Sequence, residues 1–157
     1  MTALREVRLS PRGQHLSAAQ VRQIVYPVAR RIGARVVAVH EPKIRPNFFA
    51  VVLDEPLHPG DIRRLYLLYS IDYDAWAVVL PRDPSAEPLE GCSQLHAPLF
   101  FDHEGLTEAM ADSHGIAVWP SYDLSMPVPD GFPERLPNDV AFWRPRRLGD
   151  ALFNGWD

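Results

Sequence analysis

Three residues could together form a nucleophilic or general-base site: Cys92, His96 and His103. Cys92 lies in the segment EGCSQLH, and a helix over this segment would bring its thiol close to the His96 imidazole. A thiolate nucleophile needs a nearby base and positively charged surroundings that lower its pKa. Glu87 and Glu90 make the segment acidic, which disfavours the thiolate. An enzyme or small-molecule binder that uses these three residues is therefore the alternative, and not the favoured, function.

The six histidines do not follow a metal-binding pattern. None belongs to an HExxH motif or has a second histidine four residues away. The sequence also contains no glycine-rich phosphate loop of the G-x-G-x-x-G or G-x₄-G-K-[ST] type, and no G-x-S-x-G nucleophile motif. We therefore predict no metal site and no cofactor site.

Acidic residues give the most suggestive binding pattern. Glu104, Glu108 and Asp112 recur at every fourth position, so a helix would place them in one stripe. An extended negative surface attracts basic partners and repels acidic ones. The alternative is a solvated face that only keeps the protein soluble. Further acidic residues could extend the stripe if the fold brings them together: Asp54, Glu55, Asp61, Asp72 and Asp74.

Charge is distributed unevenly along the chain, although the net charge is only −4. Residues 1–46 hold nine Lys or Arg and two Asp or Glu, whereas residues 47–143 hold four and sixteen. Such asymmetry is a clue about partners. Either the basic and acidic parts face each other inside the fold, or they form two surfaces of opposite sign.

The basic first part of the chain offers a third function, nucleic-acid binding. Proteins that bind single strands usually place aromatic residues among the basic ones, but Tyr26 is the only aromatic residue before Phe48. The overall negative charge also opposes phosphate binding. Nucleic acid is therefore an improbable partner. The candidate contacts are Arg22, Arg30, Arg31, Arg35, Lys43 and Arg45.

A helix is predicted from residue 18 onward. Ser17 and Gln20 have the spacing of a capping box, in which the two residues satisfy each other's free backbone N–H groups. Gly33 is a natural end for this helix, and Pro27 is expected to kink it or to end it early. Apolar residues recur at helical spacing: Val21, Ile24, Val25, Val28 and Ile32.

Four segments of the first half are predicted to be strands: residues 4–9, 34–42, 48–56 and 75–81. The second of these is expected to be largely buried. Residues 58–74 fit a helix or a strand, with residues 62–71 the ambiguous part, and we favour a helix because strands flank it. The resulting order over residues 4–80 is β-α-β-β-α-β, the ferredoxin-like plan, which many unrelated functions share.

The second half is predicted to be less regular. Residues 81–119 are expected to form a β-α-β extension that starts with a loop over 82–97. Asp102 should cap the helix of this extension, and Gly115 should end it. Residues 120–157 are expected to form an ordered Pro-rich strap, because six prolines alternate with apolar residues there, followed by a short helix.

The last sixteen residues, FWRPRRLGDALFNGWD, are unusually apolar for a chain end. Leu148, Leu152 and Trp156 would share one face of a short helix, which is too short to be stable alone. We expect this helix to dock on its own domain, with three arginines facing the acidic middle of the chain; the alternative is docking on another chain. The arginines are Arg144, Arg146 and Arg147.

The sequence thus predicts one α+β domain over residues 1–157 with a mixed sheet. A single cysteine, and the lack of a signal peptide or a long apolar run, favour a cytoplasmic protein that does not enter the membrane. The favoured function is a small non-catalytic binding module that presents an acidic surface to a basic protein. One concrete form is a bacterial immunity-type protein that inhibits a toxin.

Overall fold

A five-stranded sheet forms the centre of the fold. The computed structural model describes residues 7–42, 47–58, 60–81, 99–134 and 144–154. All strand pairs are antiparallel, and the strands lie in sequence order across the sheet. The strands are β1 Arg35–His40, β2 Phe48–His58, β3 Asp61–Ser70, β4 Ala75–Leu80 and β5 Leu99–Phe100. The described helices are α1 Ala18–Arg31, α2 Glu104–His114, α3 Ser121–Leu124 and α5 Leu148–Leu152.

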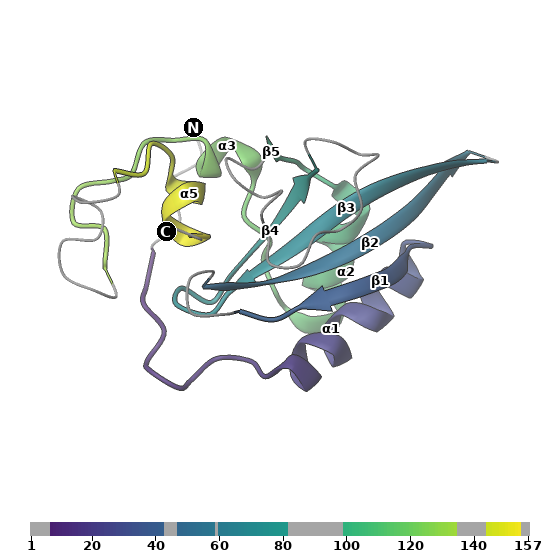
Figure 1. The fold of residues 1–157 in the computed structure, drawn as a ribbon, viewed down its shortest axis with the longest axis horizontal. Coiled ribbons are helices and arrows are strands. Elements are labelled where there is room, and N and C mark those ends of the chain that lie inside the picture. The colour runs from purple at the N-terminus through teal and green to yellow at the C-terminus, as the bar shows by residue number, and fades with distance from the viewer. Residues whose placement is uncertain (1–6, 43–46, 59, 82–98, 135–143, 155–157) are drawn as a thin grey trace.

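Apolar side chains fill both faces of the sheet. On one face, Leu53, Leu67 and their neighbours pack against α1 and α2. On the other face, Val52, Leu68 and their neighbours pack against α3 and α5 (Figure 1). The central strands therefore bury residues on both sides, and the α+β class predicted from the sequence is confirmed. The proposed division into residues 4–80, 81–119 and 120–157 stays a prediction.

The helix predicted over residues 58–74 is wrong, because Asp61–Ser70 form strand β3 and residues 71–74 form a turn. Gly60 adopts a φ of +93°, a conformation that favours glycine, and lies in the turn that folds β3 back onto β2. A strand buried on both faces loses its two-residue alternation, so its apolar residues also fit helical spacing. The second helix of the ferredoxin-like order is therefore a strand. The described sheet is antiparallel and not mixed, and the one parallel contact among the described residues is an isolated bridge between Trp76 and Val118.

The N-terminal helix and the two strands predicted beside it differ in how well they match the structure. The capping box of Ser17 and Gln20 is confirmed, and α1 continues past Pro27 to Arg31, so the proline does not end it early. β1 is not largely buried, because it is an edge strand with exposed residues. Residues 7–9 of the first predicted strand are not a strand, and Val118 forms only a one-residue bridge.

The helix that carries the predicted acidic stripe is present, and Gly115 ends it in the left-handed conformation as predicted. Asp102 does not cap this helix. Its N-cap is His103, whose Nδ1 accepts a hydrogen bond of 2.9 Å from the Leu106 N–H. The Asp102 carboxylate instead accepts hydrogen bonds from the N–H and the hydroxyl of Ser121, at the start of α3.

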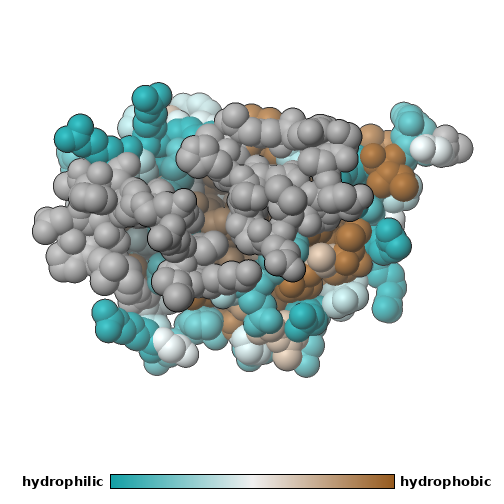
Figure 2. Space-filling model, viewed as in Figure 1, coloured by the Kyte–Doolittle hydropathy of each residue, from teal (hydrophilic) through white to brown (hydrophobic). Residues whose placement is uncertain are grey.

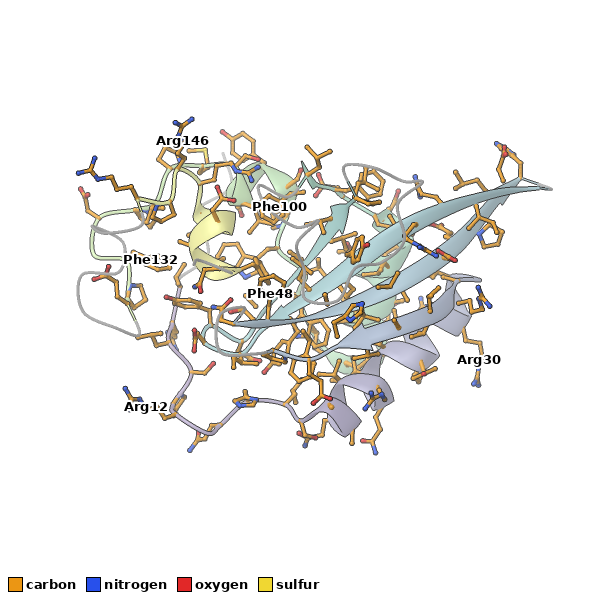
Figure 3. All side chains as sticks on the ribbon, viewed as in Figure 1. Arg12, Arg30, Phe48, Phe100, Phe132 and Arg146 are labelled. Atoms are coloured by element: carbon orange, nitrogen blue, oxygen red, sulfur yellow. The ribbon has the colours of Figure 1, made fainter. Side chains whose placement is uncertain are left out.

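The C-terminal segment docks on its own chain, as predicted. Leu148, Leu152 and Phe153 are buried against the sheet face that includes Phe48. Figure 3 shows Phe48 and Phe100 between the strands and α5. Arg147 forms two hydrogen bonds with Asp150 of the same segment, and its guanidinium lies over the Phe100 ring. Trp156 lies outside the described residues.

Candidate functional site

The β2–β3 hairpin extends well beyond its neighbouring strands (Figure 1). β1 reaches only as far as Asp54, and β4 only as far as Tyr66. The projecting part is a two-stranded ribbon, which is marginally stable without further support. Its base is supported by cross-strand ion pairs: Asp54 with Arg64, and Glu55 with Arg63.

His103 joins helix α2 to the base of this ribbon. Its Nε2 lies 2.9 Å and 3.0 Å from the two carboxylate oxygens of Glu55. The Arg63 guanidinium donates to the same carboxylate at 3.0 Å and lies over the ring of Phe101, which in turn meets the His103 ring edge-on. His103 is 9 % exposed, so this cluster is largely shielded from water.

The hydrogen bonds of His103 define its chemical role. Because Nδ1 accepts from the Leu106 N–H, the proton of the neutral ring is on Nε2, which donates to Glu55. Both ring nitrogens are therefore occupied, and His103 could act as a base only by giving up the cap of α2. The geometry therefore gives His103 a positioning role, in which it holds α2 on the β2–β3 ribbon. A role of this kind does not support the enzyme alternative.

The Glu55 carboxylate is the charged centre of the cluster. Burial alone would raise the pKa of Glu55, but the hydrogen bonds from Arg63 and His103 outweigh it, so its pKa lies below the ordinary value. The pKa of Asp54 is also lowered, mainly by its hydrogen bond with Arg64. Both acids are therefore ionised and internally compensated at neutral pH.

We expect Glu55→Gln to destabilise the protein by about 1–3 kcal/mol at pH 7, because a charge-assisted, shielded hydrogen-bond centre is lost. A carboxyl whose pKa is lower in the folded state stabilises the fold above its unfolded pKa of about 4.3, and this contribution is lost as pH falls through the folded pKa. Urea unfolding of both proteins from pH 7 to pH 3 should therefore show their stabilities converging. Glu108→Gln, at an exposed position, is the control. If the difference in free energy of unfolding between the wild type and Glu55→Gln did not change with pH, the stabilising role of the ionised Glu55 carboxylate would be contradicted.

The acidic stripe exists but is partly neutralised. Glu104, Glu108 and Asp112 are all exposed along α2. The Asp112 carboxylate accepts a 2.8 Å hydrogen bond from Arg31 of α1, so it joins two helices on the same face of the sheet. No described residue forms an ion pair with Glu104 or Glu108. The free part of the stripe is therefore its N-terminal half.

Asp72 and Asp74 lie in the turn between β3 and β4. The Asp72 carboxylate accepts from the side chain of buried Asn47 at 3.1 Å. Asp74 has a φ of +48° and interacts with the hydroxyl of Tyr69, whose pKa is raised to about 12, chiefly by burial. Both aspartates thus have contacts within their own fold, and their place in a binding surface stays a prediction.

The described basic residues that were proposed for nucleic-acid binding fall into two groups. Arg31 and Arg35 are paired with Asp112 and Asp54, the second at a longer 3.7 Å. Arg22 and Arg30 are exposed and flank exposed Tyr26 at four-residue spacing, and Figure 3 shows Arg30 extending away from the body of the protein. Lys43 and Arg45 lie outside the described residues. Of the six basic residues proposed for nucleic-acid binding, Arg22 and Arg30 are thus exposed and form no ion pair with a described residue.

Two of the predicted catalytic residues, Cys92 and His96, lie outside the described residues, so their relation to His103 stays a prediction. Within the described part of the chain, no three His, Cys, Asp or Glu side chains are grouped so as to hold a metal ion. No helix there is long and apolar enough to cross a membrane.

Sequence reasoning did not identify the partners of His103. Glu55 precedes it by 48 residues, and the sequence indicates for Glu55 only a possible extension of the acidic stripe. The consecutive acids Asp54 and Glu55 and the consecutive bases Arg63 and Arg64 are a clue only to the ion pairs of the ribbon, since opposite charges on facing strands of a hairpin pair with each other. That clue could be used only once residues 61–70 were assigned to a strand.

Comparisons with protein-family models, with curated proteins and with solved structures find no match to this chain. Its function must therefore be argued from its own residues.

Proposed function

We propose that this protein is a non-catalytic binding module that presents the exposed acidic flank of α2 to a basic protein partner. The observation that carries the proposal is the contrast within the α2 stripe. Asp112 is neutralised by Arg31, whereas Glu104 and Glu108 are exposed and form no ion pair with a described residue. Unpaired charges in a row act on a partner more strongly than charges already compensated within the fold.

The arrangement around α2 supports such a role. Leu106, Ala109 and Met110 bury the opposite flank in the core, so the orientation of the helix is fixed. The hydrogen bond from His103 to Glu55 holds its N-terminus on the sheet. A rigid helix loses little conformational freedom on binding, which favours affinity. The more specific form of the proposal is an immunity-type protein that inhibits a basic bacterial toxin by covering it.

We expect the double change Glu104→Lys and Glu108→Lys to weaken binding to the basic partner about tenfold or more, because attraction becomes repulsion at two adjacent sites. The tagged protein is used to capture partners from its host at low salt, and the affinity of the protein it retains is then measured. A matched control carries Glu41→Lys and Asp130→Lys, which make the same charge change at exposed positions outside α2.

The outcomes separate the competing functions. A basic protein that binds the wild type and the control, but not the α2 variant, supports the proposal, and inhibition of that protein's toxic activity would support its immunity-type form. Equal binding by all three proteins would remove α2 from the proposal. If Arg22→Glu with Arg30→Glu abolishes salt-sensitive binding to RNA or DNA instead, the nucleic-acid alternative replaces it.

A further inference from the structure

In the part of the chain that the structure describes, the projecting ribbon has an unpaired backbone edge on β3. β4 pairs with β3 only from Tyr66 to Ser70, and Pro81, which has no N–H, follows the end of β4. Among the described residues, no strand pairs with Asp61–Leu65 on this side. An edge of this kind can accept another strand.

Pro56 determines which groups lie on this edge. In the hairpin, Pro56 is the partner of Ile62. Since Pro56 has no N–H to donate, we infer that the two form a pair without mutual hydrogen bonds. In antiparallel sheets, the backbone groups of such a residue point away from that partner strand. The N–H and C=O of Ile62 are therefore directed to the free edge.

The side chains on the edge are self-complementary. Ile62 is 68 % exposed, the second most exposed large apolar side chain among those described. Asp61 is exposed and forms no ion pair with a described residue, while Arg63, two positions on, lies on the same side of the strand. An apolar residue between opposite charges can pair with its own copy in antiparallel orientation.

We propose that this edge binds a second copy of the chain, with β3 of each copy antiparallel and Ile62 opposite Ile62 at the two-fold axis. In this register, Asp61 of one copy faces Arg63 of the other, twice over by symmetry. Backbone hydrogen bonds join the two Ile62 residues, and the two sheets become continuous. Figure 2 shows hydrophobic surface near the end of the ribbon, where this contact would form.

Other registers are disfavoured by charge. Centring the pairing on Arg63 places two arginines opposite each other, and centring it on Asp61 does the same with two aspartates. If the register between the two β3 strands shifts by one residue, side chains that belong to opposite faces of the sheet come to lie opposite each other. The register centred on Ile62 avoids all three conflicts. This inference is independent of the acidic flank of α2.

Sedimentation velocity across a concentration range tests the dimer. We expect a monomer–dimer equilibrium in the wild type, and about a tenfold or larger increase of the dissociation constant in Ile62→Lys, which places two like charges opposite each other. The control is Leu57→Lys, which changes the other exposed apolar residue of the hairpin, 46 % exposed on β2. Circular dichroism checks that both variants remain folded.

A disulfide trap tests the register itself. In a Cys92→Ser background, Ile62→Cys would place two thiols at a hydrogen-bonded pair with Cα atoms about 5.5 Å apart, within the range of a disulfide. Mild oxidation should then give a covalent dimer much faster than with Leu57→Cys. A protein that stays monomeric up to about 0.5 mM overturns the proposal. So does a dimer that Ile62→Lys leaves intact, or equal crosslinking at both positions.

Discussion

Gly149→Ala is expected to lower the free energy of unfolding by about 1–3 kcal/mol, as overpacking of a filled site does. Gly149 is buried in α5, and a Cβ atom at this position would overlap the outer edge of the Phe100 ring. The ring cannot move without loss elsewhere, because it contacts the Phe153 ring and carries the Arg147 guanidinium above it. One methyl group would therefore disturb the whole contact between α5 and β5.

Gly105→Ala provides the matched control, because Gly105 is also a helical glycine. Its nearest neighbour, an atom of the His103 ring, would lie 3.4 Å from the added Cβ, which is ordinary contact. Alanine favours a helix over glycine by up to about 1 kcal/mol, so this variant should be neutral or slightly more stable. Urea unfolding should therefore show a clear loss of stability in Gly149→Ala and none in Gly105→Ala. Equal effects would show that helix propensity, and not the Phe100 contact, decides the result.

Local features of the sequence were predicted correctly, because their causes are local. The capping box at Ser17 needs only residues three apart, and Gly115 ends α2 through its own backbone conformation. The docking of the C-terminal helix also followed, since Leu148 and Leu152 share a face that a short helix must bury. Each of these conclusions depends on a few neighbouring residues.

The errors came from the tertiary context. Residues 62–70 lie in strand β3. Its second half, Leu65–Ser70, is buried on both faces, and that removes the alternation by which strands are identified. Asp102 is a good capping residue by type, yet His103 caps α2 because Glu55 holds its ring in place from a distant strand. No spacing within the sequence could reveal that contact.

The candidate site was only partly predictable for the same reason. The stripe of Glu104, Glu108 and Asp112 follows from helical periodicity and is present on α2. Its division into a free and a neutralised part depends on Arg31, 81 residues away in the chain. Long-range pairing thus determines which charges remain available to a partner, and sequence alone gives only their number.

The packing of the chain end depends on one polar residue, Asn47. Its backbone N–H donates to the Asn154 carbonyl at 3.0 Å, and its side-chain oxygen accepts from the Asn154 N–H at 2.9 Å. Its amide nitrogen donates to the Leu152 carbonyl and to the Asp72 carboxylate, both at 3.1 Å. Asn47 is 8 % exposed, so water cannot easily replace these bonds.

We expect Asn47→Ala to lower the free energy of unfolding by about 2–4 kcal/mol, because it leaves one buried and one partly buried backbone group without their partner. These groups are the N–H of Asn154 and the carbonyl of Leu152. Asn154→Ala is the matched control, since among the described residues its side chain donates one 3.3 Å bond, to the Ala151 carbonyl, and its backbone bonds persist. That control should cost less than about 1 kcal/mol. Similar losses in both variants would contradict the central role of Asn47.

Asn47→Asp separates hydrogen bonding from shape, because the two side chains have nearly the same volume. An aspartate can still accept from the Asn154 N–H, but its second oxygen would face the Leu152 carbonyl and the Asp72 carboxylate without a proton to donate. At pH 7 this variant should therefore be at least as unstable as Asn47→Ala. Lowering the pH supplies the missing proton, so the stability of Asn47→Asp relative to the wild type should recover in acid. Full stability at pH 7 would mean that the chain end is held by the apolar contacts of Leu152 and Phe153 alone.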